Sequence, residues 1–241
     1  MSDSSGRWLA RQKRDPFVRE ARSSGYRSRA AFKLEELDRR CGLLRSGMRV
    51  LDLGAAPGSW AQYAASRVGP KGVVVACDLL EIAPLEGVHI VQGDACDEAI
   101  QQRIRESVGS KALDLVICDM APNLSGIRVR DQAEAMELLE IALELARSML
   151  RQGMSVGKAG GQQGRAPQGN AGGAFVAKLF QGAGSDQWLA DLRKHFGTVR
   201  IVKPKASREE SREVYVVAQG LRRQSPVAMD ESDDLDESQV G

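Results

Sequence analysis

The sequence has few of the residues that metal centres and disulfide frameworks require. It contains four cysteines, none in a C-x-x-C spacing, and only two histidines, His89 and His195. A structural zinc site or a disulfide framework is therefore not expected. We also expect no catalytic metal, and a histidine base has few candidates.

Long apolar runs are missing as well. No stretch approaches the roughly 18 apolar residues of a membrane span, and residues 1–14 are polar and basic, unlike a secretory signal. We therefore expect a cytoplasmic protein that does not associate with membranes. The composition, 42% hydrophobic and 27% charged over 241 residues, is typical of a soluble globular protein, and a monomer is expected.

Charge is distributed unevenly along the chain. The formal net charge is +2, but the last sixteen residues carry six acidic residues and no basic one, so the rest of the chain carries +8. Residues 1–33 hold nine basic residues against three acidic ones. With Trp8, Phe17 and Tyr26 among them, they suit RNA, because guanidinium groups bind phosphates and aromatic rings stack on unpaired bases. A solvated surface helix is the alternative.

Short apolar runs alternate with helical stretches after residue 48. Strands are predicted over 49–53, 72–78, 88–94, 114–119, 174–180, 199–203 and 214–218, and helices over 28–40, 131–150 and 186–196. This pattern indicates an α/β fold with a largely parallel sheet and helices on both faces. Ser28 is the expected N-cap of the first helix, which carries Lys33.

Three regions follow from this pattern. We expect a basic RNA-binding arm with the start of the first helix over 1–33, one catalytic domain over 34–222, and an acidic tail without fixed structure over 223–241. The stretch 153–173 has eight glycines in 21 residues, which predicts a flexible insertion within the domain.

The clearest local motif is a strand that runs into a glycine turn and a helix. Its spacing, D-x-G-x-x-x-G from Asp52 to Gly58, differs from the dinucleotide fingerprint and from the P-loop. Asp78 follows the next strand, where a carboxylate can accept both ribose hydroxyls. Asp94 follows the third strand and suits either an adenine amine or a helix cap. Together they indicate an adenosine pocket, with S-adenosylmethionine the natural candidate and other nucleosides still open.

Two further charges lie where charge is unusual. Asp119 follows the fourth strand, beside the expected cofactor, and Lys178 interrupts the apolar run 174–180. Burying an ammonium group costs several kcal/mol unless it is paired, so Lys178 suggests function. The alternative is a lysine that reaches solvent from the strand end. Glu213 begins the last strand after a polar loop.

Six segments resemble the FtsJ/RrmJ family of ribosomal RNA large subunit methyltransferases. They are GYRSRAAFKL (25–34), DLGAAPGSWAQY (52–63), ACDLL (76–80), CDMAPN (118–123), VAKLFQG (176–182) and SREVY (211–215). The resemblance implies a Rossmann-like class I methyltransferase fold with a seven-stranded sheet. It also implies S-adenosylmethionine-dependent 2′-O-methylation of a uridine of 23S rRNA in the large (50S) subunit, which aids ribosome assembly.

The resemblance also implies which residues form the site. The family's Lys-Asp-Lys-Glu tetrad falls on Lys33, Asp119, Lys178 and Glu213, with Lys178 as the proton acceptor. Its S-adenosylmethionine contacts fall on Gly58, Trp60, Asp78, Asp94 and Asp119. The glycine-rich insertion and the acidic tail depart from the family pattern, but neither removes a tetrad residue.

Two basic groups flank the expected tetrad and should contact RNA phosphates. They are Arg27 and Arg29 on one side, and Lys203, Lys205, Arg208 and Arg212 on the other. Other acceptors stay open, because related 2′-O-methyltransferases acting on tRNA or mRNA share the tetrad. A ribosome assembly factor whose methylation is incidental is a further alternative, and the basic arm disfavours a metabolite or protein methyltransferase.

Overall fold

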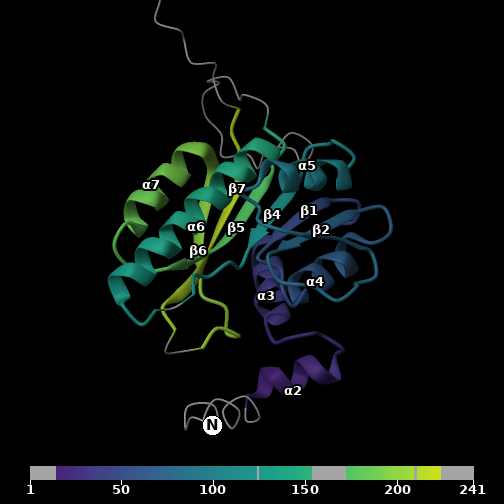
Figure 1. The fold of residues 1–241 in the computed structure, drawn as a ribbon, viewed down its shortest axis with the longest axis horizontal. Helices are drawn as coiled ribbons and strands as arrows, with labels where there is room; N and C mark the ends of the chain where they lie inside the picture. The colour runs from purple at the N-terminus through teal and green to yellow at the C-terminus, as the bar shows by residue number, and fades with distance from the viewer. Residues whose placement is uncertain (1–14, 124, 154–171, 209–210, 224–241) are drawn as a thin grey trace, which may run out of the picture.

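The computed structural model describes residues 15–123, 125–153, 172–208 and 211–223, and seven strands in this part form one sheet in the order β3-β2-β1-β4-β5-β7-β6 (Figure 1). Strands β1 to β5 pair in parallel, whereas β7 runs antiparallel to both β5 and β6. The predicted α/β class and the mostly parallel seven-stranded sheet are confirmed. The strands are β1 (Arg49–Leu53), β2 (Val73–Asp78), β3 (Val88–Gln92), β4 (Leu115–Cys118), β5 (Ala174–Phe180), β6 (Phe196–Val202) and β7 (Glu213–Leu221).

Helices cover both faces of the sheet. Buried residues of α5, α6 and α7 share one hydrophobic cluster with the sheet, and those of α3 and α4 share a second cluster with its other face. Helix α2 stands apart from the sheet in Figure 1. The helices are α2 (Pro16–Ser23), α3 (Ala31–Cys41), α4 (Ser59–Val68), α5 (Glu98–Ser107), α6 (Arg128–Met149) and α7 (Ser185–His195).

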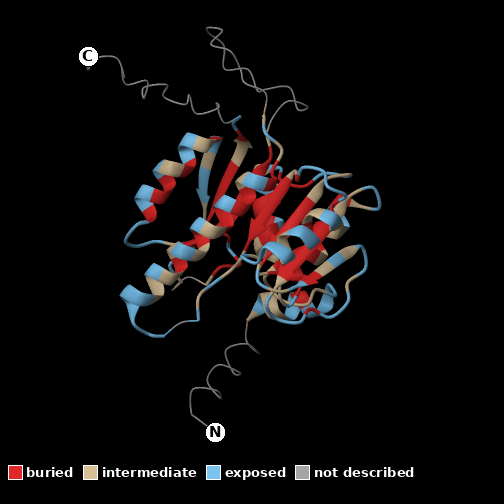
Figure 2. Cartoon of the chain, turned by 45° about the horizontal axis from the view of Figure 1, so that its top comes forward, coloured by how far each residue is buried: buried red, intermediate tan, exposed pale blue. Residues whose placement is uncertain are grey.

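The central strands are largely apolar because both of their faces are covered, with Asp52 in β1 and Lys178 in β5 as buried exceptions. In β1, Leu51 and Leu53 belong to the cluster under α5, α6 and α7, whereas Val50 belongs to the cluster under α3 and α4. Figure 2 shows these strands as a continuous buried layer. A strand buried on both sides loses the alternation of polar and apolar residues. This accounts for the runs of mostly apolar residues in the sequence.

Most predicted boundaries agree with the structure to within a few residues, but the predicted N-cap of α3 is wrong. The helix begins at Ala31, and its N-cap, Ala30, makes no side-chain capping bond. The Ser28 hydroxyl instead accepts the Ala30 N–H (3.2 Å) and shares a hydrogen bond with the Ser59 hydroxyl (2.7 Å). Ser28 therefore ties the entry of α3 to the start of α4.

Several predictions concern residues outside the described ones: the start of the basic arm (1–14), most of the glycine-rich insertion (154–171) and nearly all of the acidic tail (224–241). The ends of the insertion are held in place, because the Gly153 N–H donates to the Leu221 carbonyl (2.8 Å) and the Gly173 N–H to the Arg151 carbonyl (2.6 Å). Among the helices described, none has the length and apolarity needed to cross a bilayer.

Candidate active site

The four tetrad residues come from four different segments and meet at one edge of the sheet. Asp119 directly follows β4, Lys178 lies within β5, Glu213 begins β7, and Lys33 lies on α3. In the antiparallel pairing of β5 with β7, Lys178 lies opposite Tyr215. Side chains of directly opposed residues lie on the same face of a sheet, so this register brings a tyrosine into the group.

A continuous chain of polar contacts links these side chains. The Lys178 ammonium donates to the Asp119 carbonyl (2.7 Å) and lies 3.1 Å from the Asp119 Oδ1. The Tyr215 hydroxyl donates to the same Oδ1 (2.7 Å) and accepts from the Lys33 Nζ (3.1 Å). Lys33 then pairs with the Glu213 Oε1 at 2.7 Å. Two cations and two carboxylates are therefore joined through one phenol.

Burial strengthens this arrangement. Lys178 is only 9% exposed, so a lysine that reaches solvent is not what the structure shows, and the expected pairing of its ammonium group is confirmed. Burial raises the pKa of Tyr215, and the nearby Asp119 and Glu213 carboxylates raise it further, which keeps the phenol protonated as a donor. Burial also acts to raise the pKa of Glu213, but Lys33, Ser207 and Lys178 together outweigh it and the pKa is lowered.

The loop between β1 and α4 requires glycine at two positions. Gly54 has φ +69°, and a Cβ there would lie 2.5 Å from the Met120 Cγ. Gly58 has φ +102°, and its Cβ would lie 2.7 Å from Leu85. Only glycine adopts such angles without strain, so these positions let the loop pass close to its neighbours, as the motif predicted.

Asp78 holds the same loop in place. One carboxylate oxygen accepts the Ala56 N–H (2.8 Å) and the other accepts the Leu80 N–H (2.8 Å). A carboxylate has about four acceptor sites, so each oxygen keeps capacity for a further hydroxyl donor. The position at the carboxyl end of β2 is the one predicted.

A small hollow of about 20 Å³ lies between this loop and Asp119. Asp52 faces it and is fully buried. Apart from a weak interaction with the Ala61 N–H, neither Asp52 oxygen has a hydrogen-bond partner among the described residues. Burial raises the pKa of Asp52 strongly, and the Asp119 carboxylate adds to the effect. The lining residues are Ala30, Asp52, Gly54, Ala55, Ala56, Pro57, Ser59, Trp60 and Asp119.

Of the remaining predicted cofactor residues, Trp60 lies on the wall of this hollow. Asp94 lies at the same edge of the sheet but outside the lining of the hollow. Trp60 lines the hollow, donates its indole N–H to the Ala30 carbonyl (2.7 Å) and packs its ring 5.5 Å from that of Tyr215. Asp94 is exposed and accepts the Cys96 N–H (2.9 Å). The N-cap of α5 (Glu98–Ser107) is Asp97, so the helix-cap alternative for Asp94 is wrong, and its cofactor role stays a prediction.

Sequence reasoning missed two residues of the site, Tyr215 and Asp52. Tyr215 lies two residues after Glu213, and alternate residues of a strand share a face, so a hydroxyl-bearing ring beside a predicted catalytic residue was the available signal. Asp52 interrupts an apolar strand just as Lys178 does. The same burial argument applied to Asp52 would have identified it.

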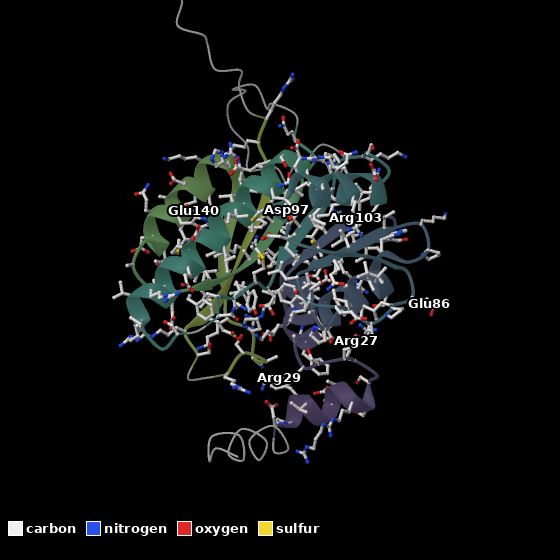
Figure 3. All side chains as sticks on the ribbon, in the orientation of Figure 1. Arg27, Arg29, Glu86, Asp97, Arg103 and Glu140 are labelled. Atoms are coloured by element: carbon white, nitrogen blue, oxygen red, sulfur yellow. The ribbon has the colours of Figure 1, made fainter. Side chains whose placement is uncertain are left out.

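The described part of the basic arm, from Asp15 onward, folds against the domain beside the site. The Arg27 guanidinium donates to the carbonyls of Pro57 and Pro84, both at 2.8 Å. Arg29 pairs with the Asp15 carboxylate and donates to the Ala206 carbonyl. Figure 3 shows both arginines between α2 and the rest of the domain. They hold residues 15–29 to the rest of the domain, and the phosphate contacts expected of Arg27 and Arg29 stay a prediction.

The aromatic residues of the arm also pack internally. The rings of Phe17 and Tyr26 lie 5.9 Å and 5.7 Å from that of Phe32 on α3. The Arg29 guanidinium lies 5.5 Å from the Phe17 ring centroid. Phe17 and Tyr26 thus form a small cluster with Phe32 that docks α2 on α3. Trp8 lies outside the described residues, and base stacking by the arm stays a prediction.

Comparisons with known proteins agree with this geometry. A model of the FtsJ-like methyltransferase family matches residues 26–221. The chain is 48% identical over 220 residues to the ribosomal RNA large subunit methyltransferase E of Cellvibrio japonicus, covering 91% of this chain and 95% of that protein. A Plasmodium falciparum structure described as a ribosomal RNA methyltransferase superposes with a TM-score of 0.68 at 24% identity, covering 83% of this chain and all of the other, and supports the fold.

Proposed function

The chain belongs to the FtsJ-like methyltransferase family, and we propose that it methylates the 2′-hydroxyl of a uridine in the 23S rRNA of the large ribosomal subunit. S-adenosylmethionine is the methyl donor, as the family membership implies. The observation that carries the proposal is the continuous chain of contacts from Lys178 to Glu213 beside the glycine loop. We further propose that the enzyme acts in the cytoplasm as a monomer.

The residues around the hollow fit this donor. S-adenosylmethionine carries a sulfonium and an ammonium group, and Asp52 is a buried carboxylate without a strong partner among the described residues. A buried charge is stabilised by a paired opposite charge, so the cationic part of the donor suits Asp52 and Asp119. Asp78 keeps acceptor capacity for ribose hydroxyls. We therefore propose that the donor is held by Gly58, Trp60, Asp78, Asp94 and Asp119. We propose Asp52, which lines the hollow, as a further contact.

The bound donor supplies an electrophilic methyl group, and the protein must align the acceptor and take its proton. We propose that Lys178, as the neutral amine, accepts the proton of the 2′-hydroxyl at Nζ while that oxygen bonds to the methyl carbon and the carbon–sulfur bond of the donor breaks. The contacts with Asp119 fix the position of Nζ. Lys33 and Glu213 orient the ribose, and Tyr215 fixes the separation between the two lysines. Positioning of this kind supplies a large part of the rate enhancement of a displacement reaction.

The acceptor is argued from the relative and from the charge of the chain. The Cellvibrio japonicus protein, 48% identical, is named for large-subunit ribosomal RNA. The excess of basic residues in 1–33 favours a polyanion over a metabolite or a protein. tRNA remains the second candidate acceptor.

The experiment is transfer of radiolabelled methyl from S-adenosylmethionine to large subunits purified from cells that lack this protein. Digestion to nucleosides should place the label in 2′-O-methyluridine of 23S rRNA. Lys178→Met should abolish transfer while keeping the affinity for S-adenosylmethionine, because it removes only the ammonium group. The matched control is Lys71→Met, since Lys71 is exposed in the turn before β2, at the opposite edge of the sheet.

Other outcomes separate the alternatives. Label in tRNA and none in the subunit would keep the fold and donor but overturn the acceptor. Full restoration of subunit assembly by Lys178→Met would favour an assembly factor whose methylation is incidental. Equal loss of turnover and donor affinity in this variant would show that Lys178 acts structurally rather than as the proton acceptor.

A further inference from the structure

The loop that connects β2 to β3 packs against the glycine loop. This β2–β3 loop, residues 79–87, contains no helix or strand. A Cβ at Gly58 would lie 2.7 Å from the Leu85 Cδ1 and 3.2 Å from the Ile82 Cγ2, so the two loops are in close contact at this point. The proposed donor contacts Gly58 and Asp78 therefore lie at the junction of two loops that must stay together.

The Arg27 guanidinium joins these two loops. Its Nη1 donates to the Pro57 carbonyl of the glycine loop (54–58), and its Nη2 donates to the Pro84 carbonyl of the β2–β3 loop, both at 2.8 Å. Hydrogen bonds from a charged donor are roughly twice as strong as those between neutral groups. Among the described residues, no other hydrogen bond joins 81–87 to a part of the chain distant in sequence. Arg27 is therefore the polar tether of the β2–β3 loop.

The backbone around Arg27 is itself held on α4. The Arg27 N–H donates to the Gln62 Oε1 (3.2 Å), and the Gln62 Nε2 donates to the Gly25 carbonyl (2.9 Å). The next residue, Ser28, shares its hydroxyl hydrogen bond with Ser59. Ser59 and Gln62 both lie in the first turn of α4, directly after the glycine loop. The guanidinium is therefore anchored from the same element that ends the glycine loop.

These contacts favour an internal role for Arg27 over the phosphate contact expected from the sequence. The bidentate grip of an arginine on a phosphate uses two parallel N–H groups. In Arg27, which is half-buried, each terminal nitrogen already donates to a backbone carbonyl. Loss of the guanidinium would leave both carbonyls without this donor and would release the β2–β3 loop from the glycine loop.

We propose that Arg27 is a positioning residue of the donor site, which holds the glycine loop and the β2–β3 loop at the separation that S-adenosylmethionine requires. The inference rests on the donor site of the proposed function and adds a residue that acts through the Pro57 and Pro84 carbonyls. Without the tether, part of the binding free energy of the donor is spent on bringing the loops together, so its affinity falls.

The test compares Arg27→Ala with Arg27→Lys and with Arg45→Ala. Arg45 is exposed in the loop before β1, at the far edge of the sheet, so Arg45→Ala makes the same charge change away from both loops. The Kd of S-adenosylmethionine is measured by calorimetric titration. Hydrogen exchange of the amides of 81–87 is measured by mass spectrometry on the donor-free protein. Affinity for large subunits is measured by co-sedimentation over a range of salt concentrations.

Arg27→Ala should raise the Kd of S-adenosylmethionine by about 10-fold or more, as loss of charge-assisted hydrogen bonds predicts. Exchange in 81–87 should become faster while exchange in the central strands stays as it is. Arg27→Lys should recover part of both effects, because an ammonium group reaches one carbonyl but does not span two. The slope of log subunit affinity against log salt should not change in Arg27→Ala, and Arg45→Ala should match the unaltered protein in donor affinity and exchange.

Two results would overturn the proposal. One is a donor Kd for Arg27→Ala equal to that of Arg45→Ala, and a reduced salt slope beside it would make Arg27 an RNA contact instead. The other is faster exchange throughout the sheet with no recovery in Arg27→Lys, which would mark general damage to the fold. If Arg27→Ala does not fold, Arg27→Lys decides, and a donor Kd and loop exchange equal to those of the unaltered protein would refute the tether. Methyl transfer to 23S rRNA tests the proposed function separately, because donor affinity is measured without an acceptor.

Discussion

The glycine loop offers a quantitative test of the structure through two substitutions. Gly54 and Gly42 both adopt left-handed backbone angles, with φ +69° and +65°. A Cβ at Gly42 would meet nothing within 4 Å, whereas a Cβ at Gly54 would lie 2.5 Å from the Met120 Cγ and 3.0 Å from the Met120 backbone. Alanine at both positions therefore shares the same backbone strain, and the difference between them isolates the collision with Met120.

The magnitudes follow from these contacts. Left-handed strain costs Gly42→Ala about 1–2 kcal/mol. Gly54→Ala carries the same strain and in addition overpacks its surroundings, which costs about 1–3 kcal/mol more. With a urea slope of about 2 kcal/mol per molar, the unfolding midpoint of Gly54→Ala should lie roughly 0.5–1.5 M below that of Gly42→Ala. Met120→Ala should restore part of this difference in a double-mutant cycle.

The assay is urea unfolding followed by circular dichroism, with calorimetric titration of S-adenosylmethionine. Gly54→Ala should also bind this donor more weakly, because Met120 adjoins Asp119 and both move when the loop is displaced. Coincident midpoints for the two alanine variants would refute this reasoning, since they would show that the loop accommodates a methyl group without cost.

Three more predictions concern titration. Burial raises the pKa of Asp52, so the folded state holds this proton more tightly than the unfolded chain does. The free energy of unfolding should therefore fall as pH rises above about 4. Asp52→Asn should lose this pH dependence, so its urea midpoints at about pH 5 and pH 8 should differ less than those of the unaltered protein. Burial acts to raise the pKa of Glu213, but Lys33, Ser207 and Lys178 together lower it. The stability that the Glu213 carboxylate contributes is therefore present above about pH 4 and lost as pH falls through the lowered value. Urea unfolding of Glu213→Gln should lack this acid-dependent component, and an unchanged profile between about pH 3 and pH 5 would contradict the ion pair. Burial raises the pKa of the Cys77 and Cys118 thiols to about 12, so neither thiol should react with iodoacetamide at about pH 8 in the folded protein. Mass spectrometry should find both alkylated in urea. Alkylation of either one in the folded protein would disprove their burial.

The periodicity of the sequence was enough to predict the sheet because its central strands are covered on both faces. The largely apolar runs 49–53 and 174–180 match β1 and β5 residue for residue. A strand with so many apolar residues must be buried on both faces. The start of α3 was mispredicted because a contact distant in sequence decides it. Ser28 has the local chemistry of an N-cap, but its hydroxyl bonds to Ser59, 31 residues away, and this contact is invisible in local sequence.

The local chemistry was enough to single out Lys178 and the glycine loop, because a charge in a buried strand needs a paired partner and a tight turn with left-handed angles needs glycine. The tetrad as a set was implied by the family resemblance. Only the tertiary structure decided what connects them. Pairing β5 with β7 places Tyr215 opposite Lys178, and packing α3 against the sheet brings Lys33 to Glu213, which lies in the last strand of the chain. The same packing turned Arg29 inward, onto Asp15 and the Ala206 carbonyl. Partners in space depend on register and packing, which act over distances that no local pattern encodes.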